Sequence, residues 1–444
     1  MKKAMKVGLV SAAVMLTLTG CLSSNNDSST KDGGIAGTQS APWIASKNTT
    51  RINASEPVEA AALVSRTLWM ATTDSNRPGG VILADPEQWQ TALVSANMIH
   101  HPNDGPLLFV GKDGVPDATL DELKRLRPKG VESNEGVQVL LAGDISEKVE
   151  AEIKGLGYKA DRIQAANPAA FAGAIDSYYS ELTNDLQMSV IVGSMESKEY
   201  TMPAVNWISH MPEPLLYVKE NEIPQETADA LKKRGGKATV YILGPEAAVS
   251  AKVAEQLGQY GRVVRIAGDN PYDNAIAFAK FKDPETGFGW GITTPGHNFS
   301  FVSLKSPDLA LAAAPFSHLG KHAPLLWTDE GAMPDSVMSY VMSIQPKYKD
   351  SPVEGPYNHA WLTGTESQLS EGAQGEIDAM LEIASASGAG HGAHGGTSAG
   401  SGSSGGTDAS AGGNTGGATT EGSAGAETQP ETQPEQTDSG MAHH

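Results

Sequence analysis

Pro106-Leu107-Leu108-Phe109-Val110 is one of three nearly identical segments that decide the organisation of this chain. The other two are Pro214-Leu215-Leu216-Tyr217-Val218 and Pro324-Leu325-Leu326-Trp327-Thr328. Each segment is followed by a short loop that ends in a proline, at Pro116, Pro224 and Pro334. The segments begin about 100 residues apart, a spacing that is too long for one solenoid unit and fits a small globular module.

A second marker recurs in step with the first. It is an Arg-Ile pair followed by a proline: Arg51-Ile52 with Pro57, Arg162-Ile163 with Pro168, and Arg265-Ile266 with Pro271. Because the two markers recur at similar intervals in all three places, we interpret the ordered chain as three copies of one module. The predicted modules are residues 50–161, 162–264 and 265–384.

Each copy shows the same order of predicted elements. Helices of ten or more residues alternate with short apolar segments, a pattern typical of parallel strands that are covered on both faces. The first predicted strands are 80–84, 189–193 and 299–303, the second are the Pro-Leu-Leu segments, and the third are 137–141, 239–243 and 359–363. The predicted helices are 57–69, 86–99 and 116–126, then 168–182, 200–208 and 224–234, then 271–281, 308–316 and 334–344, with a last helix after Gly143, Gly244 and Gly364. The expected fold class is α/β, with three tandem small parallel-sheet α/β sandwich modules.

Several stretches resemble the bacterial cell wall-binding type 2 repeat. They are Tyr241-Ile242-Leu243-Gly244-Pro245-Glu246-Ala247-Ala248-Val249-Ser250, the Arg265-Ile266-Ala267-Gly268 start, and Pro307-Asp308-Leu309-Ala310-Leu311 with Ala323-Pro324-Leu325-Leu326 downstream. The resemblance covers residues 50–384. It implies modules packed with pseudo-threefold symmetry, in units that hold surface proteins non-covalently on anionic polymers of the Gram-positive wall.

The chain also departs from that family. Prolines 57, 168 and 271 stand where the family usually has arginine, and Asn274 stands where it usually has threonine. The residues after strand three read Gly-Asp, Gly-Pro and Gly-Thr in place of a glycine pair. We expect the fold to survive these changes, whereas the ligand of the better-known members need not be shared.

The N-terminus predicts export. Lys2, Lys3 and Lys6 precede an apolar stretch, residues 7–18, that is too short to span a bilayer and is typical of a signal peptide. The stretch ends in Leu18-Thr19-Gly20-Cys21, which looks like a bacterial lipobox. We therefore expect residues 1–20 to be a lipoprotein signal peptide and Cys21 to carry the lipid that tethers the protein to the outer side of the cytoplasmic membrane. The alternative is an ordinary cleaved signal with a chance cysteine.

Two segments have the composition of unfolded chain. Residues 21–49 are rich in Ser, Asn, Asp and Gly and are predicted to form a flexible tether. Residues 385–444 are rich in Gly and Ser, acidic and devoid of Lys and Arg, and are predicted to be a disordered tail. The tail contains His391, His394, His443 and His444 without any preorganised geometry, so a solvated spacer is the favoured interpretation over a metal site.

Charge and cysteine content exclude several classes of function. The net charge is −20, which argues against nucleic acid as a partner because phosphates require a basic face. It also argues against a generally basic surface that would bind an anionic polymer by charge alone. Cys21 is the single cysteine of the sequence, which excludes an internal disulfide and a cysteine-based zinc site. No cofactor is expected, because the glycines after strand three form neither a GxGxxG nor a Walker motif.

Three histidines recur at the end of the second predicted helix. Asn97-Met98-Ile99-His100-His101 matches Asn206-Trp207-Ile208-Ser209-His210, and the third copy reads Phe316-Ser317-His318. His101, His210 and His318 are therefore candidate equivalents, and around a threefold axis they would form a ring able to hold a metal ion or an anion. The favoured alternative is that each histidine caps its own helix terminus.

The function expected from these patterns is a non-catalytic, lipid-anchored envelope protein whose three repeats bind a cell wall polymer, either an anionic secondary polymer or a peptidoglycan-linked glycan. Alternatives are a substrate-binding lipoprotein of a transporter and a membrane-tethered scaffold or receptor. A less favoured alternative is an enzyme acting on wall glycan, with carboxylates from Asp85, Glu87, Asp308 or Asp329 at strand ends.

Overall fold

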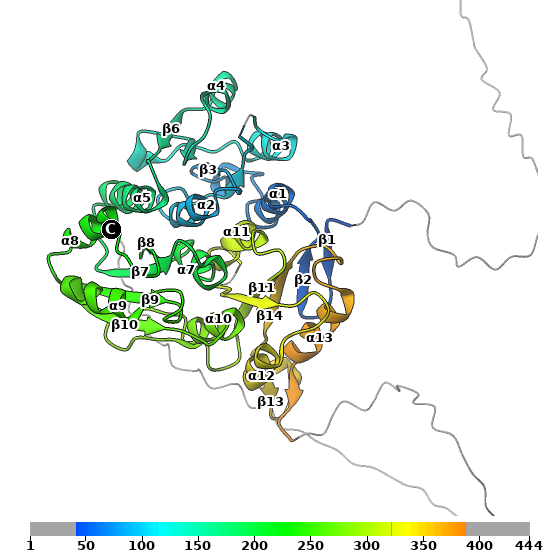
Figure 1. Cartoon of the computed structure of the whole chain (residues 1–444). Helices are drawn as coiled ribbons and strands as arrows, with labels where there is room; N and C mark the ends of the chain where they lie inside the picture. Colours follow the sequence, from blue (N-terminus) through cyan, green and yellow to red (C-terminus); the bar gives the residue numbers. More distant parts are fainter. Residues whose placement is uncertain (1–40, 113, 321, 388–444) are drawn as a thin grey trace, which may run out of the picture. The chain divides into compact units, whose positions relative to one another are not determined.

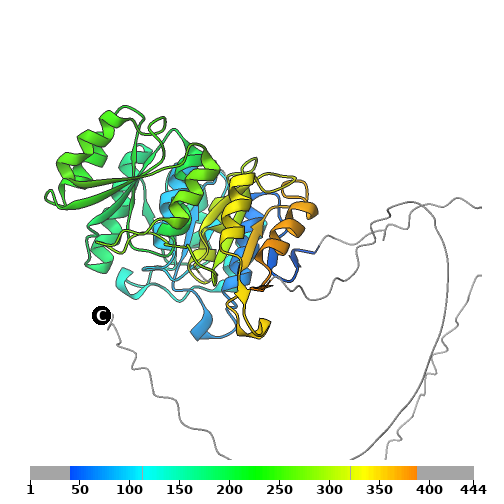
Figure 2. The same cartoon turned by 90° about the horizontal axis from the view of Figure 1, so that it is seen from below.

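Three small parallel sheets form the framework of the protein (Figure 1). The computed structural model describes residues 41–112, 114–320 and 322–387. The predicted signal peptide, Cys21, most of the tether and the tail from residue 388 lie outside the described residues. Helices cover the sheets on both faces, as Figure 2 shows for the green second repeat, so the predicted α/β sandwich architecture is confirmed.

Each sheet contains four parallel strands in the same spatial order. The sheets are β4-β3-β5-β6 and β8-β7-β9-β10, and a third, β12-β11-β14-β2, to which β1 adds an antiparallel edge. The strands are β1 (Trp43–Ala45), β2 (Thr49–Ile52), β3 (Val81–Ala84), β4 (Leu107–Phe109), β5 (Val139–Ala142), β6 (Ala160–Ile163), β7 (Ser189–Ser194), β8 (Leu215–Val218), β9 (Ala238–Leu243), β10 (Gly261–Ile266), β11 (Asn298–Ser303), β12 (Leu325–Thr328) and β14 (His359–Thr363). A separate pair joins β13 (Lys347–Tyr348) to β15 (Ala384–Ser385). The three strands predicted in each copy are all present.

The fourth strand of each sheet was not predicted, and it contains the Arg-Ile marker. β6 and β10 end at Ile163 and Ile266 and complete the first and second sheets. The corresponding strand of the third sheet is β2, which comes from the start of the described chain and pairs with β14 (Figure 1). The sheets therefore divide the chain after each Arg-Ile pair, whereas the predicted module starts, at residues 50, 162 and 265, all fall within these strands.

Helices after the Arg-Ile marker link successive repeats. They are α1 (Pro57–Leu68), α5 (Pro168–Thr183) and α10 (Pro271–Lys280), and each begins at its marker proline, whose missing N–H would be unpaired there in any case. α5 packs on α2 of the first repeat and on α8 and β8 of the second. α10 packs on α6 and β12 in the same way, and α1 packs on β4 and on α11 of the third repeat. The contact between α1 and α11 joins the third repeat back to the first.

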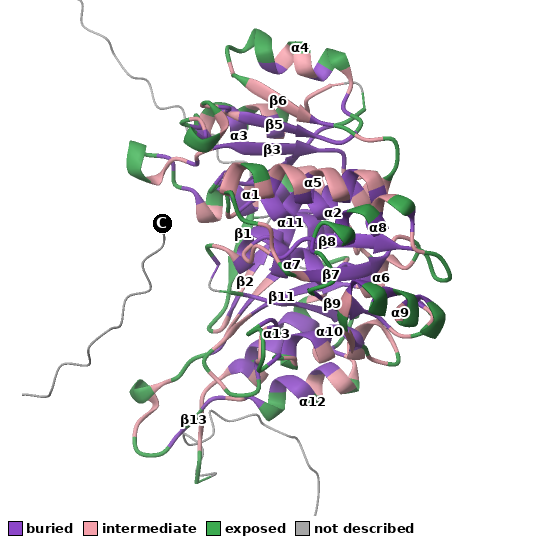
Figure 3. Ribbon diagram, turned by 90° about the vertical axis from the view of Figure 1, so that its left-hand side faces the viewer, coloured by how far each residue is buried: buried purple, intermediate pink, exposed green. Residues whose placement is uncertain are grey.

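The second predicted helix of each copy is the central one. It is split into α2 (Trp89–Ser95) with η2 (Ala96–Met98), α6 (Lys198–Thr201) with α7 (Ala204–Ile208), and α11 (Leu309–Ala313) with η5 (Ala314–Ser317). Residues 91–99, 201–209 and 309–317 are buried without exception, as Figure 3 shows for these helices in purple. A helix without a polar face has to be covered on all sides. The three central helices contact each other pairwise, while the exact pseudo-threefold relation remains a prediction.

The remaining helices lie on the outside of the sheets and have one exposed face. They are α3 (Asp117–Leu126), α4 (Glu147–Gly155), α8 (Gln225–Lys232), α9 (Ala251–Leu257), α12 (Asp335–Ser343) and α13 (Glu371–Leu381). Short 3-10 turns are η1 (Asp74–Asn76), η3 (Glu132–Asn134), η4 (Gly258–Tyr260) and η6 (Pro352–Glu354). None of the described helices is long and apolar enough to cross a bilayer.

Aromatic residues of the Pro-Leu-Leu segments join the repeats. The hydroxyl of Tyr217 donates to the Gln90 carbonyl of the first repeat at 2.8 Å, and Nε1 of Trp327 donates to the Glu199 carbonyl of the second at 3.1 Å. Both side chains are buried, and a buried Tyr or Trp needs a partner for its polar tip. In the second and third copies the marker therefore supplies both the second strand and a contact to the preceding repeat.

The arginine of each Arg-Ile marker connects the fourth strand by hydrogen bonds to the turn that follows the third strand. Nη1 of Arg265 donates to the Gly244 carbonyl at 2.8 Å, and Nη1 of Arg51 donates to the Gly364 carbonyl at 3.0 Å. Nε of Arg51 also donates to Oε1 of Gln374 at 2.8 Å, and its side chain is almost fully buried. Arg162 bonds the Ile145 carbonyl in the first sheet.

We expect Arg51→Met to lower the free energy of unfolding by about 2–4 kcal/mol, because it leaves buried acceptors without donors. Arg265→Met is the matched control. Arg265 is only partly buried, so its replacement should cost about half as much. Urea denaturation of both variants measures the difference. Equal losses would contradict the role given to β2 in closing the third sheet.

Candidate functional site

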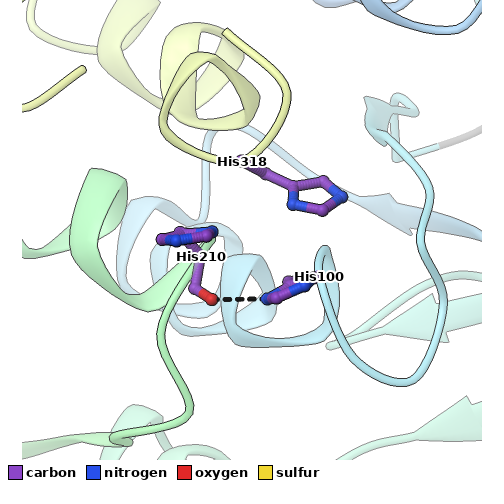
Figure 4. A group of neighbouring side chains, drawn as sticks. All are labelled: His100, His210 and His318. Carbon is purple, nitrogen blue, oxygen red and sulfur yellow. Dashed lines mark hydrogen bonds between the residues drawn. The ribbon is translucent and has the colours of Figure 1, made fainter. Parts of the chain in front are cut away.

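The ends of the three central helices converge on a cluster of histidines (Figure 4). His100, His210 and His318 each follow directly on one of the fully buried runs, at residues 91–99, 201–209 and 309–317. One ring nitrogen of each lies within 4.8 Å of one ring nitrogen of the other two. Each repeat therefore contributes one imidazole to a single place.

The sequence match pointed to His101 as the first member, and the structure places His100 there. The two rings stack with centroids 4.1 Å apart, and His100, not His101, belongs to the group of three close ring nitrogens. The alignment of Asn97 with Asn206 shifted the first copy by one residue. The signal that identifies His100 is the end of the apolar run, since the histidine is the first residue beyond it in every copy.

Hydrogen bonds fix the rings. Nδ1 of His100 lies 2.6 Å from the carbonyl oxygen of His210, so Nδ1 carries the proton and Nε2 has the lone pair. Nε2 of His318 lies 3.1 Å from Oδ1 of Asp104, which leaves the lone pair of that ring on Nδ1. Nδ1 of His210 is buried and has no hydrogen-bond partner. Two rings thus present a free lone pair, and the third has a buried nitrogen without a partner.

Burial and mutual repulsion disfavour a positive charge on His100 and His210. Burial, followed by the neighbouring histidines, lowers the pKa of His210 to about 3. Burial also lowers the pKa of His100 and of His322, whose ring stands edge-on to His210 at 4.2 Å. Burial alone would raise the pKa of Asp104, but its hydrogen bond with His318, and its attraction to that ring when the ring is protonated, hold the pKa below its ordinary value.

Polar side chains next to the histidines join the repeats. Oγ of Ser209 lies 2.5 Å from Oγ of Ser317 and donates to the Ala314 carbonyl at 2.7 Å. Nδ2 of Asn97 donates to the Ile208 carbonyl at 3.3 Å, and Nδ2 of Asn206 donates to the Ala323 carbonyl at 2.8 Å. The helix ends are therefore held across all three repeats, which preorganises the histidines.

A second candidate feature is a cleft of about 530 Å³ between the first and third sheets. It is formed by the loops after β2, β3, β4, β11 and β14, at the carboxyl ends of the strands, where α/β proteins commonly bind ligands. Its charged and amide side chains are Glu56, Asp85, Glu87, Lys112, Asp308 and Gln368. The cleft is thus mainly acidic.

Three of the four strand-end carboxylates singled out in the sequence, Asp85, Glu87 and Asp308, line this cleft. Asp85 is buried and accepts from the backbone N–H of Glu87 at 3.0 Å, so it shapes the turn. Asp308 forms an ion pair with Lys198 of the second repeat. Asp329 lies elsewhere and accepts from the hydroxyl of Tyr272. Glu56, Glu87 and Lys112 are the exposed charges of the cleft.

No protein-family model matches the chain, and no curated protein matches it in sequence. Among the solved structures that share its fold are two proteins from Clostridium difficile. Cwp6 from Clostridium difficile superposes with a TM-score of 0.58 and 16% identity over 76% of this chain and 48% of that chain. Cwp8 from Clostridium difficile superposes with a TM-score of 0.58 and 18% identity over 76% and 52%. This chain spans about half the length of each, and the likeness at this identity shows the fold.

We expect the stability of the protein to fall as the pH is lowered from 7.5 to 5.0. The folded-state pKa of His210 lies below its ordinary value, so the unfolded chain binds the proton more tightly. The stabilisation is complete above the ordinary histidine pKa and is lost as the pH falls below it. A carboxylate with the same pKa in the folded and unfolded chain adds nothing to this pH dependence. Urea denaturation at both pH values, with a chelator present, measures the effect.

In His210→Gln this pH dependence should shrink. His359→Gln, which removes a histidine from β14 outside the cluster, is the matched control, and the two variants are compared at both pH values. An unchanged pH dependence in His210→Gln would contradict the electrostatic picture of the cluster.

Proposed function

We propose that this chain is a non-catalytic protein of the bacterial cell envelope that binds a cell wall polymer through its three repeats. The observation that carries the proposal is the three-sheet fold shared with Cwp6 and Cwp8, whose names designate cell wall proteins. The resemblance of the repeats to the cell wall-binding type 2 family supports the same function. Lipid attachment at Cys21 would keep the repeats at the membrane, facing the wall.

The strand-end cleft is the proposed binding site, and its charge indicates the chemistry of the polymer. Glu56 and Glu87 are exposed there beside a single lysine, Lys112. Carboxylates repel phosphate groups but accept hydrogen bonds from sugar hydroxyls, and such charge-assisted bonds are strong. The net charge of −20 also disfavours binding of a phosphate-rich polymer. We therefore assign a hydroxyl-rich glycan segment to the cleft, in preference to the phosphate-rich part of a wall polymer.

Co-sedimentation of the full chain with purified cell walls tests the binding. The expected result is saturable binding that disappears when secondary polymers are stripped chemically from the walls. Binding that survives stripping would indicate that the ligand is peptidoglycan itself. An absence of binding to either preparation would contradict the proposal, and so would the release of soluble sugar from the walls, which would indicate an enzyme.

The double variant Glu56→Gln, Glu87→Gln tests the cleft. It keeps the shape of both side chains and removes two charged acceptors, so the affinity for walls should fall about tenfold or more. Glu147→Gln, Glu255→Gln is the matched control, because both residues are exposed on the outer helices α4 and α9. Equal affinity of the two double variants would exclude this cleft as the binding site.

Cys21→Ser tests the anchor. The full chain should sediment with the membrane fraction of expressing bacteria and enter the detergent phase on phase separation. The variant, without a lipid, should be released into the aqueous phase. A variant that still partitions with the parent into detergent would show that Cys21 is not the point of attachment.

A further inference from the structure

We propose that His100, His210 and His318 form a binding site for a divalent transition-metal ion of the zinc type, with one ligand from each repeat. This inference is independent of wall binding. It rests on the geometry of the cluster, on the hydrogen bonds of its rings and on the origin of the three ligands in three repeats.

The spacing of the ligand atoms suits such an ion. Three ring nitrogens lie within 4.8 Å of one another in the metal-free arrangement. Zn–N bonds of about 2.0–2.1 Å in a tetrahedral site place the nitrogens ~3.3 Å apart. The side chains therefore need to approach by about 1.5 Å at most, which small rotations of the imidazole rings achieve.

The other nitrogens of the rings are held as in metal sites. A metal-bound histidine usually donates its second N–H to a carbonyl or a carboxylate, which fixes the tautomer and the orientation of the ring. His100 donates to the carbonyl of His210, and His318 donates to Asp104. Both rings keep an unprotonated nitrogen available. Nδ1 of His210, buried without a partner, is the third available atom.

The chemistry of the donors selects the ion. Three neutral imidazoles suit Zn²⁺, Cu²⁺ or Ni²⁺, whereas Ca²⁺ and Mg²⁺ require oxygen ligands. Three histidines with an open fourth position form the ligand set of known zinc sites. None of the three residues is classed as fully buried, but the side chain of His318 is only 9% exposed, so the cluster is largely enclosed.

A bound ion would fasten the three repeats to one another. His100 follows η2, His210 follows α7 and His318 follows η5, and these helix ends lie side by side (Figure 4). A ligand that binds the folded state alone stabilises it. The ion would thus act as a clamp on the assembly of repeats.

The test uses the full chain with His391, His394, His443 and His444 replaced by alanine, because a histidine-rich tail binds metals by itself. The chelator-treated protein is titrated with Zn²⁺ by calorimetry and with Co²⁺ by visible absorption. The expected result is one Zn²⁺ per chain, a Co²⁺ spectrum of a four- or five-coordinate site, and a higher Tm with Zn²⁺.

His210→Ala should lower the affinity for Zn²⁺ at least a hundredfold, and His359→Gln should leave it unchanged. Asp104→Asn removes the carboxylate that orients His318, and it should lower the affinity about tenfold without loss of the fold. This variant decides the question if His210→Ala fails to fold. Failure to bind one Zn²⁺, or an affinity unaffected by Asp104→Asn and His210→Ala, would overturn the proposal.

Discussion

Mutual burial of three apolar helices is the constraint on which the rest of the structure depends. Residues 91–99, 201–209 and 309–317 have no exposed side, and no single sheet could cover such a helix on all faces. Each helix is covered by its own sheet, by the other two central helices and by one of the linking helices α1, α5 and α10. One repeat alone would expose a large apolar surface, so the three repeats form one cooperative unit.

Both candidate sites follow from this constraint. The helices end where they meet, so the first residue after each buried run lies next to its two equivalents, and in this chain all three are histidines. At the opposite ends of the same helices, the loops after the strands of two sheets face each other and form the acidic cleft. Histidines and cleft thus arise from one packing arrangement.

The sequence predicts the regular part of this structure well. Strands such as Val81–Ala84 and Leu215–Val218 are continuous apolar segments, and the proline-started helices have clear beginnings. The fourth strands were missed because β6 reads Ala-Asp-Arg-Ile and is only partly buried, so no apolar signal marks it. The closure of the third sheet by β2 was missed for another reason: its partner β14 lies about 300 residues away, and no local pattern reports such a pairing.

The sequence raised a histidine ring as a hypothesis and favoured helix capping over it, and the structure brings three histidines together. The motif alignment chose His101, whereas the burial pattern selects His100. The position of the histidine is set by the end of the buried helix and not by the similarity of the neighbouring residues. The acidic cleft was missed as a unit, since its residues come from five loops of two repeats. What joins them is the docking of one sheet beside another, which the local sequence does not encode.

The measurement that tests the central packing most directly is disulfide trapping between two central helices. Ser209 and Ser317 belong to different repeats, and their hydroxyl oxygens lie 2.5 Å apart. In a chain with Cys21→Ser, Ser209→Cys and Ser317→Cys, mild oxidation should form an internal disulfide rapidly and completely, because the two sulfur atoms would start close to bonding distance. Two thiols that remain fully open to alkylation would contradict the convergence of the central helices and everything inferred from it.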